Sequence, residues 1–259
     1  MKNVRFVVMI VIMLSLVLVG GFAQAEKKAA DNPKDEKQAL KEAALDALLM
    51  MDSDKAMPAL EKIINSKDNP KLRKKAVFIL SQKDRKKALP ILVRLAQQDP
   101  DAEVRENAVF WLGQMEGDES ISALLDIYAK TTDEKLKKKL IFSFSQHQSD
   151  KAFNKLKDIA FKETDQELRK QAVFWIGQSG KKEALDILKG ILDSDAPLEI
   201  QKSAIFGISQ YAGGGNIDIM INIAKTNKKP ELRKQAIFWL GQSEDPKAVK
   251  VLEEILNEK

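Results

Sequence analysis

The amino-acid sequence predicts an all-α solenoid, and two series of repeated residues lead to this fold class. One seven-residue segment recurs six times at a constant step of 32 residues, most clearly at 108–114, 172–178 and 236–242. Apolar residues outside these segments recur at the same step, and within each unit they lie three residues apart, on one side of a helix. Each unit is therefore predicted to hold two helices of about 12 to 14 residues.

The two series define about seven units over residues 36–259. The copies of the seven-residue segment start at Ala76, Ala108, Leu140, Ala172, Ala204 and Ala236, after a degenerate copy at Ala44. The clearest apolar series is Leu60, Leu92, Leu124, Leu156, Leu188, Met220 and Leu252. Asp and Pro residues precede most of the predicted helices as caps and stops. The charged, Pro-containing residues 26–35 are predicted to be a flexible leader.

The segment 1–25 has the pattern of a secretory signal peptide. Lys2 and Arg5 precede an apolar run at 6–19, and Ala23 and Ala25 are the small residues that signal peptidase requires. This run is shorter than the roughly 20 residues that cross a bilayer as a helix. We therefore expect cleavage after Ala25 and a periplasmic or secreted protein; the alternative is an uncleaved membrane anchor.

Composition excludes several classes of site. The sequence has no cysteine, which excludes lipidation at a cysteine, disulfides, a thiol nucleophile and a thiolate metal site. The formal net charge of +5 falls to +3 once Lys2 and Arg5 are removed. So mild a charge does not indicate a nucleic-acid partner. No cofactor or metal site is predicted.

The repeats resemble the HEAT family, in particular the short bacterial type that is also called phycobilisome-lyase-like. The residues that carry the resemblance are Leu232-Arg233, Ala236, Leu240 and Gly241, with their equivalents in other units. The resemblance covers residues 36–259 and implies a right-handed solenoid whose concave layer consists of the Arg-bearing helices. It is specific for the fold and says little about function.

A phenylalanine recurs at a position that is usually polar or charged in such repeats. On a helical wheel it lies opposite the buried arc, beside a lysine four residues earlier and a glutamine four residues later. This arrangement predicts a partner-binding surface with an apolar centre and a polar rim; the alternative is a packing seam in which the rings stack between repeats. The candidate residues are Phe78, Phe110, Phe142, Phe174, Phe206, Phe238, Gln114, Gln146, Gln178, Gln210, Gln242, Lys138, Lys170, Lys202 and Lys234.

Other recurring residues are interpreted as structural. The basic series is Arg73, Arg105, Lys137, Arg169, Gln201 and Arg233. We expect its first four members to pair with Asp68, Asp101, Asp133 and Asp165, which lie four or five positions earlier; the alternative is an anionic groove. Trp111, Trp175 and Trp239 recur at every second unit and are predicted to be core residues. Two residues after the position of these tryptophans, glycine and serine alternate from one repeat to the next, which indicates that a pair of repeats was duplicated.

The sequence argues against an enzyme. Its one histidine, His147, is expected to be solvated in a polar loop. Deoxyhypusine hydroxylases share HEAT-like repeats, but their iron site needs several His-Glu pairs, and His147 is followed by Gln148. Bilin lyases also share the repeats, but they act in the cytoplasm. Gly213-Gly214-Gly215 lacks the residues of a phosphate-binding loop and is predicted to be a linker.

These observations favour an exported scaffold or adaptor that binds a protein or peptide on the concave face, with no nucleic acid and no stable membrane span. One alternative is an accessory subunit or chaperone of an envelope enzyme, similar to a lyase. Another is a self-assembling structural module. It would associate through the last repeat, where Val249, Leu252 and Ile255 are expected to be partly uncovered or buried by a second chain.

Overall fold

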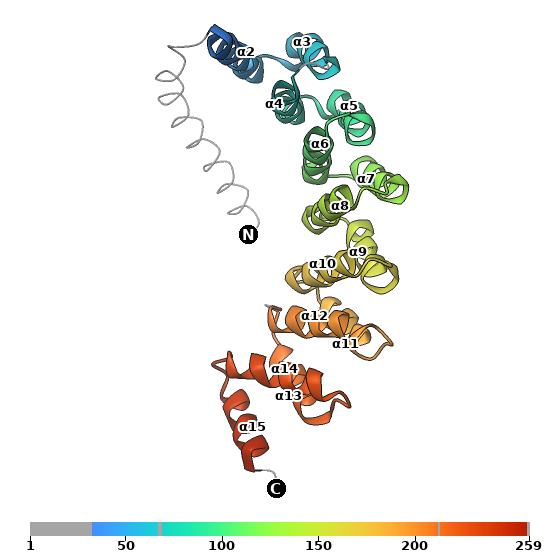
Figure 1. Cartoon of the computed structure of the whole chain (residues 1–259), viewed down its shortest axis with the longest axis vertical. Coiled ribbons are helices and arrows are strands. Elements are labelled where there is room, and N and C mark those ends of the chain that lie inside the picture. The colour runs from blue at the N-terminus through green and yellow to red at the C-terminus, as the bar shows by residue number, and fades with distance from the viewer. Residues whose placement is uncertain (1–32, 67–68, 212, 258–259) are drawn as a thin grey trace. The chain divides into compact units, whose positions relative to one another are not determined.

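The computed structural model describes residues 33–66, 69–211 and 213–257. Within these residues the chain forms fourteen α-helices and no strand, which confirms the all-α repeat fold (Figure 1). The predicted signal peptide, and the predicted leader up to residue 32, lie outside the described residues. The chain divides into two compact units, one through Ala88 and one from Leu89.

The first unit contains α2 (Pro33–Met50), α3 (Ser53–Asn65) and α4 (Pro70–Ser81). α2 begins at Pro33 rather than at residue 36, since proline suits the first turn of a helix. α2 packs against both α3 and α4. Leu45, Leu60 and Ala76 are buried where these helices meet, so the degenerate copy of the segment near Ala44 is a genuine repeat.

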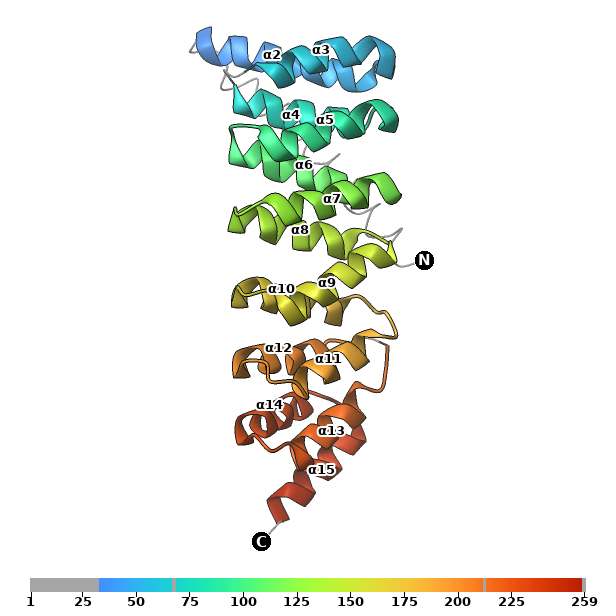
Figure 2. The same ribbon diagram turned by 90° about the vertical axis from the view of Figure 1, so that its right-hand side faces the viewer.

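The second unit is a double layer of helices, and α5 (Arg85–Gln98) spans the division between the units. We name its two layers the even-numbered and the odd-numbered layer (Figures 1 and 2). The even-numbered layer consists of α6 (Ala102–Gln114), α8 (Glu134–Gln146), α10 (Gln166–Gln178), α12 (Leu198–Ser209) and α14 (Pro230–Gly241). The odd-numbered layer includes α7 (Asp118–Lys130), α9 (Asp150–Lys162), α11 (Ala184–Leu192), α13 (Asn216–Thr226) and α15 (Pro246–Asn257).

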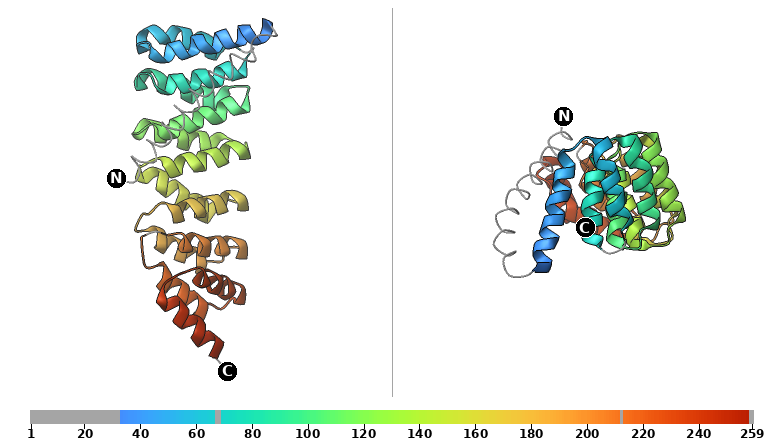
Figure 3. Two further views of the ribbon diagram at one scale, coloured as in Figure 1. Left: turned by 90° about the vertical axis from the view of Figure 1, so that its left-hand side faces the viewer. Right: turned by 90° about the horizontal axis from the view of Figure 1, so that it is seen from above.

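The helices of the second unit lie side by side in two layers (Figure 3), and most of the repeated apolar residues of the odd-numbered helices are buried. Leu92, Leu124, Leu156, Leu188 and Met220 are all buried. Each even-numbered helix packs against the next even-numbered helix and against an odd-numbered partner. This is the nearest-neighbour packing of a solenoid, in which no unit buries its apolar face alone.

Side-chain caps fix where the even-numbered helices begin. Asp101, Asp133 and Asp165 accept hydrogen bonds from backbone N–H groups in the first turns of α6, α8 and α10. Such caps satisfy donors that have no partner within the helix. The loop at 213–215 joins α12 to α13, as the linker prediction requires, and Gly214 and Gly215 adopt the positive φ that favours glycine.

The last repeat departs from the others. α15 lies at an angle to the helices before it (Figure 1). Val249 is 54% exposed and Leu256 is 83% exposed, while Leu252 and Ile255 are half-buried. The expectation that this repeat is partly uncovered is confirmed for the described residues.

Candidate binding surface

A continuous row of aromatic rings crosses the even-numbered layer of the second unit. Each helix from α6 to α14 contributes one or two rings, and each ring contacts the next. We name this set the aromatic row, and its members in order of contact are Trp111, Phe110, Phe142, Trp175, Phe174, Phe206, Trp239 and Phe238.

The ring contacts alternate between two geometries. Phe110 and Phe142 stack with centroids 6.2 Å apart, and Phe174 and Phe206 stack at 6.0 Å. Between these pairs, Trp175 lies 5.3 Å from Phe142 and 4.9 Å from Phe174, with its ring inclined to both. Offset-stacked and inclined pairs at such distances attract one another. The rings therefore form a packing seam between repeats.

The seam is nevertheless on the surface. Every ring of the row is half-buried except that of Phe238, which is 57% exposed. The structure therefore shows the packing-seam alternative, with an edge that stays accessible, and partner binding along this edge stays a prediction. Phe78, the remaining member of the series, is a half-buried residue of α4 in the first unit.

The prediction that the tryptophans are core residues is wrong. Trp111, Trp175 and Trp239 are half-buried members of the row. In the intervening repeats, the residues equivalent to these tryptophans are Ser143 in α8 and Gly207 in α12. A wheel drawn for one helix places these indoles near the core. The neighbouring helices, however, leave room for them only among the phenylalanine rings.

The small residues explain the two-repeat alternation. A Cβ atom placed at Gly113 would lie 2.6 Å from Ser143 Cβ, and one placed at Gly177 would lie 2.7 Å from Gly207 Cα. Accordingly, α6 contacts α8, and α10 contacts α12, more extensively than α8 contacts α10 or α12 contacts α14. Close interfaces between small residues thus alternate with wider interfaces that hold a tryptophan wedge.

A groove opens along the first part of the row. Its volume is about 530 Å³, and it crosses α6, α8 and α10. Two stacked phenylalanines and a tryptophan form its apolar wall, while amide and charged side chains form the polar one. The lining residues are Glu106, Asn107, Phe110, Lys138, Lys139, Phe142, Gln171 and Trp175.

The lysines of the predicted rim are ion-paired on their own helices. Nζ of Lys138 lies 2.5 Å from a carboxylate oxygen of Glu134. Lys170 pairs in the same way with Glu167, and Lys202 with Glu199, both at 2.8 Å. These pairs raise the pKa of Lys138 and Lys170 through hydrogen bonds to the carboxylates. Lys234 is exposed at the end of the series. The rim is therefore polar but nearly neutral.

The glutamines of the predicted rim fall into two groups. Gln146 and Gln210 donate to the hydroxyls of Ser145 and Ser209, at 3.1 and 3.2 Å. Each of these serines in turn donates to the carbonyl of a phenylalanine of the row. The other three follow a glycine and are exposed: Gln114, Gln178 and Gln242.

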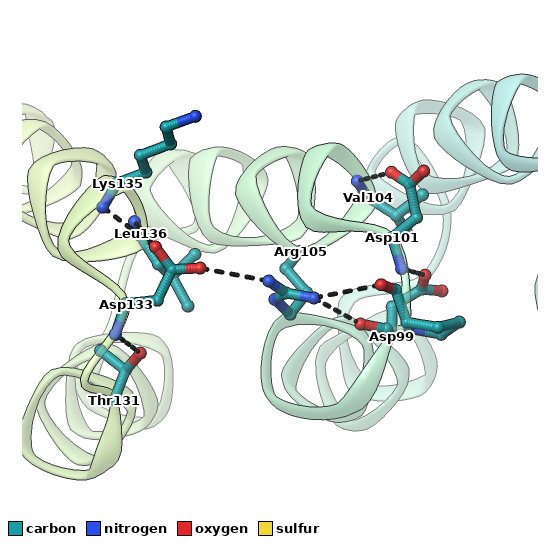
Figure 4. Close-up of polar contacts among 9 residues, drawn as sticks. Asp99, Asp101, Val104, Arg105, Thr131, Asp133, Lys135 and Leu136 are labelled. Carbon is teal, nitrogen blue, oxygen red and sulfur yellow. Dashed lines mark hydrogen bonds and ion pairs between the residues drawn. The ribbon is translucent and has the colours of Figure 1, made fainter.

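The basic series is structural, but its partners differ from those predicted. An Nη atom of Arg105 donates to the carbonyl of Asp99 at 2.9 Å, and the other pairs with Asp133 at 3.1 Å (Figure 4). Asp101, the predicted partner, instead caps α6. Other members of the series also donate hydrogen bonds to backbone carbonyls. Arg73 donates to Ser66, Arg169 to Ala160, and Gln201 to both Leu192 and Ser194. Asp68 lies outside the described residues, and Arg233 is exposed.

These bonds have a common electrostatic reason. The last carbonyls of a helix have no partner within it and carry the negative end of its dipole. The guanidinium groups neutralise these carbonyls at the ends of odd-numbered helices. In Asp133, the bond from the backbone N–H of Leu136 lowers the pKa most; burial opposes this, and Arg105 lowers the pKa further. The result is a pKa below the usual range.

Comparison with known families decides the assignment. The model of HEAT repeats matches residues 58–145 and 121–209, which together exceed half of the chain. The PBS lyase HEAT-like repeat matches residues 232–258. The chain belongs to the HEAT-repeat family. No curated protein matches the sequence of this HEAT-repeat protein.

Two solved structures are similar over most of their length. Human deoxyhypusine hydroxylase, in complex with glycerol, has 16% identity and a TM-score of 0.37, covering 95% of this chain and 92% of that one. The complex of CpcE and CpcF of phycocyanin lyase from Nostoc sp. PCC7120 has 15% identity and a TM-score of 0.42, covering 86% of this chain and 89% of that one. Neither similarity is strong enough to bear on the function of this HEAT-repeat protein.

His147 is not solvated as predicted but buried between two HEAT repeats. It is the C-cap of α8, and its Nδ1 accepts a hydrogen bond from the backbone N–H of Ser149 at 3.2 Å. Its Nε2 lies 3.2 Å from the hydroxyl of Ser120 at the start of α7. The surrounding polar sequence gave no indication of this burial, because the partner comes from the preceding repeat. The geometry assigns His147 a structural role.

A second polar cluster links the HEAT repeats behind the row. The hydroxyl of Tyr128 donates to Glu163 at 2.7 Å, and Lys137 Nζ lies 3.5 Å from the same carboxylate oxygen. Burial raises the pKa of Tyr128 well above its usual value, and the bond to Glu163 adds to this. Burial alone would raise the pKa of Glu163, but Tyr128 and Lys137 lower it on balance. Lys137 thus pairs with Glu163 of the next helix pair rather than with Asp133, which lies four positions earlier.

The described HEAT repeats offer neither a membrane span nor a metal site. No helix there has the length and apolar character required to span a bilayer. Within the same residues, no group of three or more His, Cys, Asp or Glu side chains is placed to hold a metal ion. The aromatic row and its groove are therefore the candidate functional surface.

Proposed function

We propose that this HEAT-repeat protein is an exported scaffold that binds a protein or peptide partner along the aromatic row, and that it acts by binding rather than by catalysis. The observation that carries the proposal is the accessible edge of a continuous eight-ring row beside a groove of about 530 Å³. A contiguous apolar surface bordered by polar groups is typical of interaction sites.

The chemistry of the row supports binding. Tryptophan is among the residues that most often dominate binding energy, and aromatic side chains in general are enriched at protein interfaces. The rings are held by their neighbours, so little side-chain entropy is lost when a partner covers them. The paired lysines and exposed glutamines at the rim supply hydrogen bonds without a strong net charge. These features favour a partner that is apolar at its centre and polar at its edge.

Export is supported by the sequence pattern of residues 1–25. Recovery of the protein from cell fractions, followed by sequencing of its first residues, tests this part. We expect the protein in the envelope or medium with Glu26 as its first residue. An intact Met1 on a cytoplasmic protein would contradict export without affecting the binding proposal.

Site-specific photo-crosslinking tests the binding proposal in the producing cell. A photoreactive phenylalanine analogue replaces Phe142 in one variant and Ala129, an exposed residue of α7, in the control. We expect a defined crosslinked product from position 142 that is absent from position 129. Identical products from both positions, or none from position 142, would refute binding along the row. A crosslinked enzyme would favour the alternative of an accessory subunit.

A further inference from the structure

The aromatic row contains the same arrangement of three rings twice. In the first copy, Phe110 stacks on Phe142, and Trp175 lies 5.3 Å beyond Phe142. Shifting each residue by two repeats gives Phe174 stacked on Phe206, with Trp239 lying 5.4 Å beyond Phe206. We name these two sets the first and second ring triads. Their equivalence follows from the duplicated pair of repeats, since each triad spans one close and one wide interface.

Unsatisfied polar atoms accompany both triads. Oε1 of Gln171, Oε1 of Gln235 and the indole N–H of Trp239 are buried with no hydrogen-bond partner in the described part of the chain. Gln171 lines the groove of the first triad, and Gln235 holds the equivalent position two repeats later. Unsatisfied buried groups are uncommon in native proteins. The terminal torsion of glutamine is soft, which lets an amide oxygen turn toward a ligand.

The chemistry of these atoms limits the ligand. Two acceptors and one donor are matched by a ligand that offers both N–H and C=O groups, and an extended peptide backbone offers them in alternation. Three of the lysines near the triads are ion-paired, Lys139 with Glu106, Lys170 with Glu167 and Lys202 with Glu199, and Lys234 on α14 is exposed. Most of the charge around the rings is thus compensated, so the groups that contact the rings are expected to be uncharged.

The rings of both triads favour an aromatic side chain as the anchor. The stacked phenylalanines are inclined by only 7° and 12° with centroids 6.2 and 6.0 Å apart, so the rings are offset from one another, and each of them is half-buried. A further aromatic ring can pack against them in the offset or inclined geometries that aromatic pairs prefer.

We propose that the two triads bind one extended peptide through two uncharged aromatic anchors, one in each triad. This inference rests on the proposed function and names the partner's chemistry. The triads are two helices apart, which at 8–10 Å per packed helix is about 18 Å. An extended chain covers that distance in five to six residues at about 3.3 Å each. Side chains of an extended chain alternate between its two sides, so only an even spacing places both anchors toward the rings. The peptide therefore carries its anchors about six residues apart and lies across the even-numbered helices.

Calorimetry with synthetic peptides tests the inference on the protein as recovered from its producing cell. The probes are uncharged Ser/Gly/Thr peptides that carry one tryptophan, or two tryptophans spaced by two, five, six or ten residues. Linking two anchors makes the second contact intramolecular, which raises affinity when the spacing fits. We expect a spacing of six to bind at least tenfold more tightly than one anchor or a spacing of two or five, since five places the anchors on opposite sides of the extended chain.

Matched variants locate the two anchors. Phe142→Leu removes a ring of the first triad and Phe206→Leu removes one of the second. Phe161→Leu changes a half-buried phenylalanine of the odd-numbered layer and is the control. Either triad variant should reduce the two-anchor affinity to that of the single-anchor peptide, while the control leaves it unchanged.

Several outcomes would overturn the inference. These are affinity that is independent of spacing, equal binding by the control and triad variants, no peptide binding at all, and binding of chitohexaose or maltohexaose in place of the peptides. If position 142 still crosslinks to a partner in cells, the proposed function stands and only the two-anchor inference is wrong. If that crosslink is also absent, both are wrong.

Discussion

Replacing Gly177 by alanine is expected to separate two HEAT repeats that the small residues hold together. A Cβ at this position would lie 2.7 Å from both Cα and the carbonyl oxygen of Gly207. Favourable contacts of carbon atoms begin near 3.5 Å, so the two helices must move apart by roughly 0.8 Å. The atoms that are met belong to the backbone and cannot rotate away.

The magnitude follows from two opposing effects. Inserting a methyl group into a packed interface costs about 1–3 kcal/mol. Alanine also favours helix by up to about 1 kcal/mol over glycine, which reduces the loss. We therefore expect Gly177→Ala to lower the free energy of unfolding by about 1–2 kcal/mol. Urea denaturation followed by circular dichroism measures this change. Hydrogen exchange should show the loss of protection in α10 and α12.

Gly241→Ala is the matched control, because it lies at the equivalent position of α14. A Cβ there would meet nothing within 4 Å. This variant should be as stable as the parent or slightly more stable. If Gly177→Ala proves as stable as Gly241→Ala, the reasoning that small residues set the spacing of the repeats is refuted.

Three further predictions concern the polar contacts. Arg105→Ala removes the hydrogen bond to the carbonyl at the end of α5 and the bond to Asp133, so we expect the free energy of unfolding to fall by about 2 kcal/mol. Arg233→Ala, which changes an exposed member of the series, should alter the free energy of unfolding by less than about 0.5 kcal/mol. Equal urea midpoints for the two variants would contradict this. The pKa of Asp133 is lowered in the folded state. Its contribution to stability is therefore present above the pKa of about 3.9 in the unfolded chain, and it is lost as pH falls through the pKa of the folded state. The difference in urea midpoint between the parent and Asp133→Asn should shrink from pH 6 to pH 2. His147→Ala leaves the N–H of Ser149 without its acceptor and should cost about 1–2 kcal/mol; an unchanged melting temperature would show that His147 is not a structural residue.

The repeat fold was predictable because each unit repeats its apolar pattern without drift. A constant period with buried Leu92, Leu124 and Leu156 leaves few arrangements other than stacked helix pairs. The helical wheel likewise placed the phenylalanine series outside the buried arc, and no member of the series is fully buried. These features depend on residues of one helix, and a helical wheel represents one helix adequately.

The errors arose where the partner lies in another repeat. Trp175 falls near the buried arc of α10, yet its surroundings are decided by Phe142 on α8. Arg105 was assigned to Asp101 by proximity in sequence, but that carboxylate already caps the first turn of α6. His147 follows a polar pattern, although its burial depends on Ser120 from the repeat before it. Single-sequence patterns contain no information about such neighbours.

The two-repeat alternation links the packing of the solenoid to its candidate function. Tryptophan at every repeat would place a wedge at every interface and leave no directly stacked phenylalanine pair. Small residues at every repeat would close the interfaces and remove the indoles. Alternating Trp175 with Ser143 and Gly207 produces both geometries in turn, so a groove is bounded by a stacked pair on one side and an indole on the other. The structural unit of this solenoid is therefore a pair of HEAT repeats, and the peptide that we propose must match the spacing of two such units.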